Sequence, residues 1–271
     1  MPQSQPTNSS QVDGLSSQFQ RRWESTYHWR SMCSMLLGTP GLRAAWPMSS
    51  IDVGNPLCRD IAGGGYHLTM NVGGVPFGRD PNGIAPLANF GGAANQYLSR
   101  ASALGAWATI TGGEAHIQAA DRGLTVGGWF WWSALPGAGE VIMAKADGGA
   151  NLSYMLNIGA TNQIFFAVWA GPISANSAAT INAGWNHCVG IYDQASQTVF
   201  VELNGVITSG AAGAAPALVA DTAAPFTIGA DGAGANLFTG YASDCFLAAT
   251  SLSQGFVKAG YHYTKAAYGV K

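Results

Sequence analysis

The sequence has 271 residues, of which 48% are hydrophobic and only 10% are charged, and its formal net charge is −2 at pH 7. This length fits one large all-β domain or two small domains. The charged fraction is far below the roughly 25% of an average soluble domain. The surface is therefore either covered by small neutral residues or partly buried against other chains, and we expect a homo-oligomer, with dimer and trimer both open. The lack of a net positive charge argues against nucleic acid as a partner.

Residues 1–41 are expected to form an N-terminal arm. Residues 1–18 are rich in Gln, Ser, Asn and Pro, which predicts an extended or disordered segment. Residues 19–37 have aromatic and basic residues at helical spacing, and the Gly and Pro residues at 38–41 then end the predicted short helix. We expect this segment to dock on a polar or acidic protein surface, although a solvated tail explains its charges equally well. Its candidate contact residues are Arg21, Arg22, Trp23, Tyr27, Trp29 and Arg30.

The sequence shows neither the apolar segment of a secretory signal nor a run of ~18 apolar residues that would span a membrane. The four cysteines have no CxxC spacing, and Cys188 and Cys245 lie inside apolar strand patterns, which is typical of buried thiols. We therefore expect synthesis and assembly in a reducing cytoplasm and no membrane partner.

From residue 42 onward, short apolar segments recur every 8–12 residues between turn signals, which is the spacing typical of a β-sandwich. Residues 198–203 (TVFVEL) alternate with period two and end at the turn pair Asn204-Gly205. Only residues 251–263 near the end have helical character. The predicted strands are 44–48, 66–72, 88–90, 95–101, 116–121, 124–134, 140–146, 153–159, 163–170, 178–183, 185–193, 198–205, 225–230 and 241–249.

Several of these segments, taken in order, resemble the laminin-G-like (LamG), concanavalin A-like jelly roll of bacterial and viral proteins. The quoted pieces are 41–47 (GLRAAWP), 60–68 (DIAGGGYHL), 90–98 (FGGAANQYL), 125–129, 183–187 (AGWNH), 192–205, 238–241 (FTGY) and 252–261. The resemblance implies an all-β fold, a two-sheet antiparallel jelly-roll sandwich over residues 42–261. Residues 262–271 would then form a C-terminal tail. The glycines at the turns and the Trp and β-branched residues within the strands agree with this fold.

The resemblance also raises the question of calcium, because family members bind calcium through acidic residues at two of these turns. Here the corresponding positions read Phe90-Gly91-Gly92 and Ala242-Ser243-Asp244, so two carboxylates are missing. Calcium needs several hard oxygen ligands. We therefore expect no cofactor and no strong metal site, with Asn95 and Asp244 as weak calcium candidates.

Catalytic chemistry is not indicated. A retaining glycosidase of this fold needs two carboxylates about 5–5.5 Å apart, and no strand carries a pair of acidic residues at suitable spacing. His187 occupies a strand position of the resemblance, which favours a core residue over a general base. No nucleophile-elbow, zinc or phosphate-binding motif is present. We expect a protein that is not an enzyme.

Trp131 and Trp132 are adjacent in a predicted strand, so their side chains point to opposite faces and cannot both fill one core. One of them is expected to be exposed on the sheet or buried against a partner. Such an aromatic residue stacks on sugars or anchors a protein interface.

Two functional hypotheses follow. The first is a virion structural protein assembled in the host cytoplasm, a phage capsid decoration or head-fibre protein that its arm holds to the major capsid protein or another virion protein. The alternative is a carbohydrate-binding, lectin-like adhesion module on a phage tail or on a cell surface, where a glycan is the partner. The viral assignment relies on analogy with LamG domains of such proteins, and a fold alone does not fix function.

Overall fold

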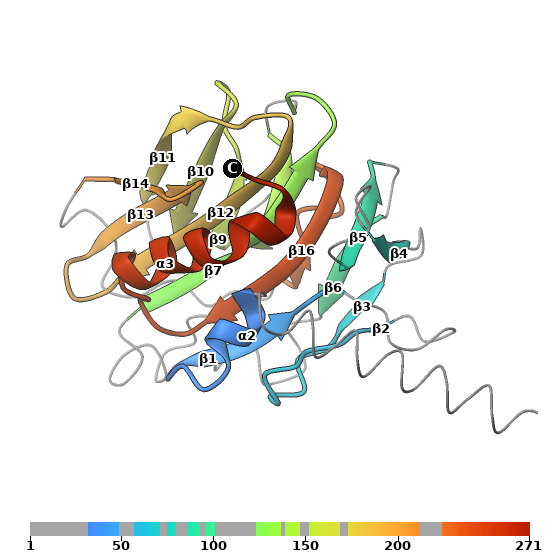
Figure 1. Cartoon of the computed structure of the whole chain (residues 1–271), viewed down its shortest axis with the longest axis horizontal. Helices are drawn as coiled ribbons and strands as arrows, with labels where there is room; N and C mark the ends of the chain where they lie inside the picture. The colour runs from blue at the N-terminus through green and yellow to red at the C-terminus, as the bar shows by residue number, and fades with distance from the viewer. Residues whose placement is uncertain are drawn as a thin grey trace, which may run out of the picture.

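The computed structural model describes residues 32–48, 57–70, 75–79, 86–92, 96–100, 123–136, 139–146, 152–168, 173–211 and 224–271. Within these ranges, two antiparallel β-sheets face each other, and helices lie on the outer face of one of them (Figure 1). The two-sheet antiparallel sandwich predicted from the sequence is confirmed.

The first sheet, sheet A, has the strand order β14-β13-β12-β7-β16-β5-β4 in the described part of the chain, and β1 pairs with β16 beside this path. Its strands are β1 (Leu42–Trp46), β4 (Phe77–Arg79), β5 (Pro86–Gly91), β7 (Gly123–Trp132), β12 (Gly184–Asp193), β13 (Thr198–Leu203), β14 (Val206–Ser209) and β16 (Thr239–Ala248).

The second sheet, sheet B, has the order β11-β10-β9-β8-β15-β6-β3-β2 over the same described ranges. Its strands are β2 (Leu57–Cys58), β3 (Leu68–Met70), β6 (Leu98–Arg100), β8 (Val141–Ala146), β9 (Leu152–Ile158), β10 (Gln163–Val168), β11 (Ile173–Thr180) and β15 (Phe226–Ile228).

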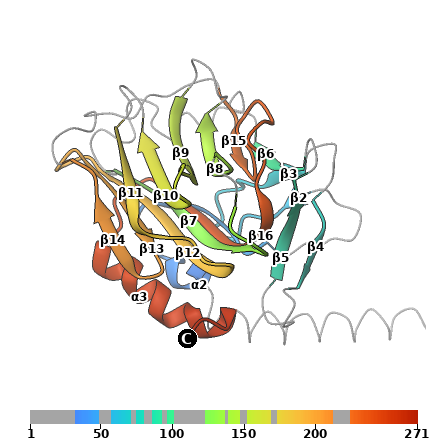
Figure 2. The same cartoon turned by 90° about the horizontal axis from the view of Figure 1, so that it is seen from above.

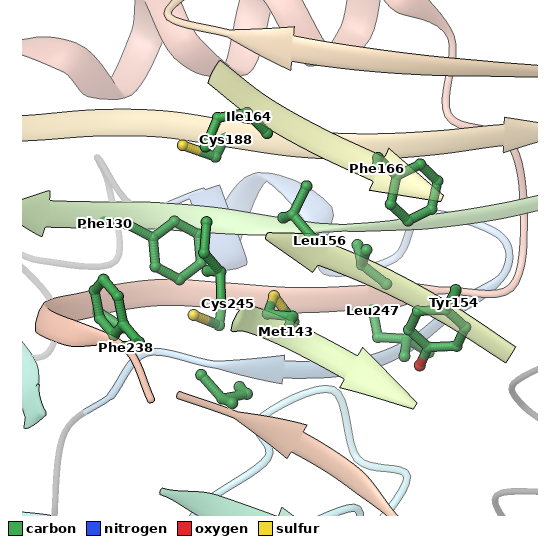
Figure 3. Close-up of a cluster of buried hydrophobic side chains, with 14 of the residues drawn as sticks. Phe130, Met143, Tyr154, Leu156, Ile164, Phe166, Cys188, Phe238, Cys245 and Leu247 are labelled. Carbon is green, nitrogen blue, oxygen red and sulfur yellow. The ribbon is translucent and has the colours of Figure 1, made fainter. Parts of the chain in front are cut away.

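The main core lies between the two sheets and is filled by the inward-facing residues of their strands (Figure 3). Trp46 of β1 stacks on Phe226 of β15, with ring centroids 5.3 Å apart. Each large apolar side chain that is fully buried stabilises the fold by about 1.5–3 kcal/mol. The largest side chains of this kind in the main core are Trp46, Trp132, Tyr154, Tyr192, Phe90, Phe130, Phe166, Phe226 and Phe238.

Local sequence explains how neighbouring strands pack so closely. A Cβ at Gly127 of β7 would lie 2.6 Å from the Cys188 carbonyl oxygen of β12, so only glycine fits there. The hairpin between β13 and β14 turns at Asn204 and Gly205, whose φ angles are 52° and 84°. This is the two-residue turn that the Asn-Gly pair predicts.

Helices α2 (Met32–Leu36) and α3 (Gln254–Thr264) and the 3-10 helix η3 (Lys265–Tyr268) cover part of the outer face of sheet A. Met32 and Val257 pack with Val189 and Phe246 in a second hydrophobic cluster. In Figure 2, α3 lies below β12, β13 and β14, and neither α2 nor α3 extends below β4 and β5.

The C-terminal end of the chain is folded where residues 262–271 were expected to form a tail. Helix α3 continues to Thr264, and Tyr268 of η3 is only 3% exposed. Of the helix expected over residues 19–37, the structure describes Met32–Leu36, and residues 1–31 lie outside the described part. The expected strand 116–121 also lies outside it. No helix of the described residues is both long enough and apolar enough to cross a membrane.

Candidate functional site

Trp131 and Trp132 point to opposite faces of β7, as their adjacency predicts. Trp132 is 1% exposed in the core between the sheets, and its Nε1–H donates to Glu140 Oε2 at 3.3 Å. A buried ring offers no face to a ligand, so Trp132 is excluded as a glycan or interface residue. Trp131 is half-buried on the outer face of sheet A.

The ring of Trp131 stacks on the ring of Tyr241 from β16, with centroids 4.6 Å apart and an interplanar angle of 22°. We call these two residues the aromatic pair. Both are half-buried. Gly240 allows this approach, because a Cβ there would lie 2.1 Å from the Trp131 carbonyl oxygen. The aromatic pair is therefore held by strand register rather than by a loop.

The aromatic pair is the centre of a longer row across sheet A. Trp185 of β12 pairs with Trp131, Trp131 pairs with Tyr241, and Tyr241 pairs with Asn89 of β5. Directly opposed residues of an antiparallel sheet share a face. We call Trp185, Trp131, Tyr241 and Asn89 the cross-strand row.

The row is closed at one end and open at the other. Trp185 is 8% exposed and meets Tyr268 of η3 edge to face, with centroids 4.8 Å apart. At the far end Asn89 is half-buried, and its backbone N–H donates to the carbonyl of the exposed Pro76 at 2.8 Å. No hydrogen bond within the described part of the chain reaches the Tyr241 hydroxyl or the Asn89 side-chain amide.

Of the four residues in this row, only Trp131 was predicted from the sequence as a binding residue. The period-two pattern places Trp185 on one face of its strand and Tyr241 on one face of another. It does not show that the two strands flank β7, because that depends on long-range pairing.

Beside the row, the aromatic side chains are covered by the C-terminal elements. Trp129 stacks on Tyr268 at 4.3 Å between centroids, and its Nε1–H donates to Thr264 Oγ1 at 3.0 Å. The Tyr268 hydroxyl forms hydrogen bonds with Ser243 Oγ and with Asp244 Oδ2, each at 3.0 Å. The C-terminal segment is thus fixed to the sheet by stacking and by hydrogen bonds.

A histidine–carboxylate pair lies in the same covered region. His187 Nδ1 is 2.7 Å from Glu202 Oε2, and both side chains are 0% exposed. The other oxygen, Oε1, accepts the backbone N–H of Gly205. His187 Nε2 is buried without a partner in the described residues. The pair reaches no solvent and no open surface, so it stabilises the contact between β12 and β13 and has no access to a substrate.

Of the two calcium candidates, the structure describes only Asp244. Asp244 lies at a bulge of β16 with φ 50°, fully buried, and its Oδ2 accepts the Met32 backbone N–H at 2.9 Å besides the Tyr268 hydroxyl. Asn95 lies outside the described residues. Among those residues no group of three or more His, Cys, Asp or Glu side chains is arranged to hold a metal ion. Asp244 serves instead as the cap of α2 and the anchor of η3.

The candidate arm residues, Arg21 to Arg30, lie outside the described part, and nothing is placed for them. What the structure does place is the point where that segment joins the domain. Met32 and Leu36 of α2 are fully buried against sheet A, and Cys33 Sγ donates to the Cys245 carbonyl at 3.5 Å.

The comparison with sequence families decides the classification. Residues 102–257, more than half of the chain, match the Laminin_G_3 family, described as the Concanavalin A-like lectin/glucanases superfamily. The chain belongs to this family. No curated protein sequence matches it significantly.

Solved structures of low sequence identity share the fold of this laminin-G member. The arabinanase domain 4 from Geobacillus stearothermophilus, in complex with arabinotriose, is 14% identical with a TM-score of 0.56, and the alignment covers 81% of this chain and 98% of that domain. The binding domain of botulinum neurotoxin DC in complex with SialylT is 10% identical with a TM-score of 0.55, covering 83% and 52%. Trypanosoma rangeli sialidase in complex with sialic acid is 15% identical with a TM-score of 0.56, covering 84% and 33%. The chain thus spans about half of the toxin binding domain and a third of the sialidase.

Proposed function

We propose that this laminin-G domain is a non-catalytic carbohydrate-binding module that holds glycans on the outer face of sheet A. The observation that carries the proposal is the half-buried aromatic pair, Trp131 and Tyr241, stacked at 4.6 Å on the outer face of sheet A beside the cluster that η3 covers. The buried aromatic residues next to the pair are covered by Tyr268 of η3, whereas the rings of the pair remain partly exposed to solvent.

The chemistry of the pair suits a sugar. A sugar ring has an apolar face of C–H groups and a rim of hydroxyls. Tyr and Trp combine an apolar ring with one polar group, so they are common at binding surfaces where an apolar contact borders water. The rings also stand on a rigid sheet, so little conformational entropy is lost when a ligand binds.

The comparisons support a binding role without assigning a ligand. One similar domain is described in complex with arabinotriose and one with SialylT, and the family includes lectins as well as glucanases. In this chain the buried His187–Glu202 pair has no access to a substrate. Binding without turnover is therefore the function that the described residues support best.

The test is binding to a glycan array by wild type and by Trp131→Ala. We expect loss of array binding in Trp131→Ala, because the stacking surface is removed. Tyr263→Ala is the matched control, since Tyr263 is an aromatic residue on α3, 48% exposed and outside the row. An array signal that Trp131→Ala leaves intact, or no signal from the wild type, contradicts the proposal.

A second function, that of a virion structural protein such as a capsid decoration protein, is favoured by one observation. Helix α2 is buried on sheet A through Met32 and Leu36. The point at which the preceding sequence, with its Trp and Arg residues, joins the domain is therefore fixed at Met32, which suits an attachment segment.

This second proposal is tested by co-purification with a virus particle. A variant lacking residues 1–31 keeps α2 and the whole described domain. We expect it to fold and to lose particle occupancy, whereas undiminished occupancy rules the segment out as the attachment.

A further inference from the structure

We propose that the cross-strand row binds a linear, neutral oligosaccharide laid across the strands of sheet A, with Asn89 recognising the unit farthest from η3. This inference rests on the proposed glycan-binding function and adds the class of ligand, its direction and a residue that determines specificity.

The direction follows from strand register. Trp185, Trp131, Tyr241 and Asn89 are opposed one after another on β12, β7, β16 and β5. Neighbouring strands lie about 4.8 Å apart, so the two steps from Trp131 to Asn89, the part of the row that Tyr268 leaves open, span about 10 Å between their ends. That span exceeds a single sugar ring and fits a short chain.

The charge of the ligand follows from the side chains of the row. Three are aromatic and one is a carboxamide, and Pro76, which precedes β4 and accepts the Asn89 backbone N–H, is apolar, so none of these side chains carries a charge. A carboxylate of an acidic sugar would lose hydration over these residues without gaining a cationic partner from the row, which is unfavourable. A neutral glycan loses less hydration free energy when it binds at this surface.

The polar groups of the row suit hydroxyls. The Asn89 amide offers two donors and an acceptor, and the Tyr241 hydroxyl offers one donor and accepts as well. Neither group is taken by a hydrogen bond of the described residues. The Trp185 end is closed by Tyr268, so within the row a chain that starts over Trp131 extends toward Asn89.

The experiment measures array specificity and then calorimetric affinity as a function of chain length. Arrays should carry neutral linear oligosaccharides, together with sialylated and uronic-acid oligosaccharides of matched length. Calorimetry then uses one to four units of the best linear ligand, with wild type, Asn89→Ala and, as control, Ser209→Ala. Ser209 is an exposed residue on β14, the opposite edge of the same sheet.

We expect neutral ligands to bind best and affinity to rise up to about three units, one over each of Trp131, Tyr241 and Asn89 at the strand spacing. Asn89→Ala should weaken binding of the three-unit ligand by about threefold to tenfold, the worth of one hydrogen bond. It should leave one-unit binding and the melting temperature unchanged, and Ser209→Ala should match the wild type throughout.

Two outcomes overturn the inference while leaving the proposed function standing. One is Trp131-dependent binding that prefers acidic glycans, and the other is Trp131-dependent binding that Asn89→Ala affects at no chain length. Absence of binding to every saccharide contradicts the proposed function itself.

Discussion

At the scale of single residues, position on the sheet decides which aromatic side chains remain for binding. Trp129, Trp131 and Trp132 are close in the sequence, yet one is covered by η3, one is half-buried and one is in the core. The alternation of β7 was readable from the sequence. The choice of Trp131 over Trp132 was not, since both faces of this strand are apolar.

Asp244 is a residue whose role the structure reassigns from candidate calcium ligand to structural cap. Its carboxylate accepts the Met32 N–H and the Tyr268 hydroxyl, and it is fully buried. Asp244→Ala should lower the free energy of unfolding by about 2–4 kcal/mol, because it leaves buried donors unpaired. Asp244→Asn, which keeps an acceptor and tolerates positive φ, should cost less.

Urea unfolding with and without calcium checks this prediction. We expect calcium to leave the midpoint of the wild type unchanged. A calcium-dependent rise of that midpoint that disappears in Asp244→Ala would restore the metal hypothesis.

At the scale of elements, the long central strands were predicted well and the edge strands were not; β11, for example, covers Ile173–Thr180, where a strand over 178–183 was expected. Strands β7, β12, β13 and β16 carry strong apolar or alternating patterns. Strands β2, β4 and β14 have two to four residues each, too few for a periodic signal. Residues 262–271 were expected to form a tail because the family resemblance ends at residue 261, and the sequence does not show that Tyr268 packs on Trp129 and Trp185.

Tyr268 is the residue through which η3 holds the sheet. Tyr268→Ala should lower the free energy of unfolding by about 3–5 kcal/mol, the usual cost of removing a buried aromatic ring. Tyr268→Phe keeps the stacking on Trp129 and loses only the hydroxyl contacts, so about 1–2 kcal/mol is expected.

Chemical denaturation followed by tryptophan fluorescence measures both variants. Tyr268→Ala should also shift the native tryptophan emission to longer wavelength, because Trp129 and Trp185 become more exposed to water. Equal stability of Tyr268→Ala and wild type would show that the packing of η3 on the outer face of sheet A does not stabilise the domain.

At the scale of the whole molecule, strand order brings together residues that the sequence keeps apart. The cross-strand row draws on residues 89, 131, 185 and 241, and it forms only because β12, β7, β16 and β5 are neighbours. The family resemblance predicted the sandwich but not the row, because a fold does not specify which outward-facing side chains meet. The functional site is therefore the part of this protein least readable from its sequence.

The whole domain also depends on pH through its buried thiols. Cys33, Cys58, Cys188 and Cys245 are all free and buried, and burial raises the pKa of Cys58 to about 12 and that of the other three well above their usual value. The folded state therefore holds protons that the unfolded state releases near pH 9. Stability that is complete below that pH is lost as pH rises toward 12, by on the order of 1.4 kcal/mol per pH unit for each thiol.

We accordingly expect the free energy of unfolding to be constant with respect to these thiols below about pH 8 and to fall steeply above about pH 9. Cys58→Ala removes one of the titrating thiols, so the free energy of unfolding should fall less steeply with pH, by on the order of 1.4 kcal/mol per pH unit. Native protein at pH 8 should react with a thiol reagent far more slowly than denatured protein, in which all four cysteines react. Rapid labelling of the native protein, or a stability that does not change up to pH 11, would show that the core admits hydroxide and that these thiols are not sealed between the sheets.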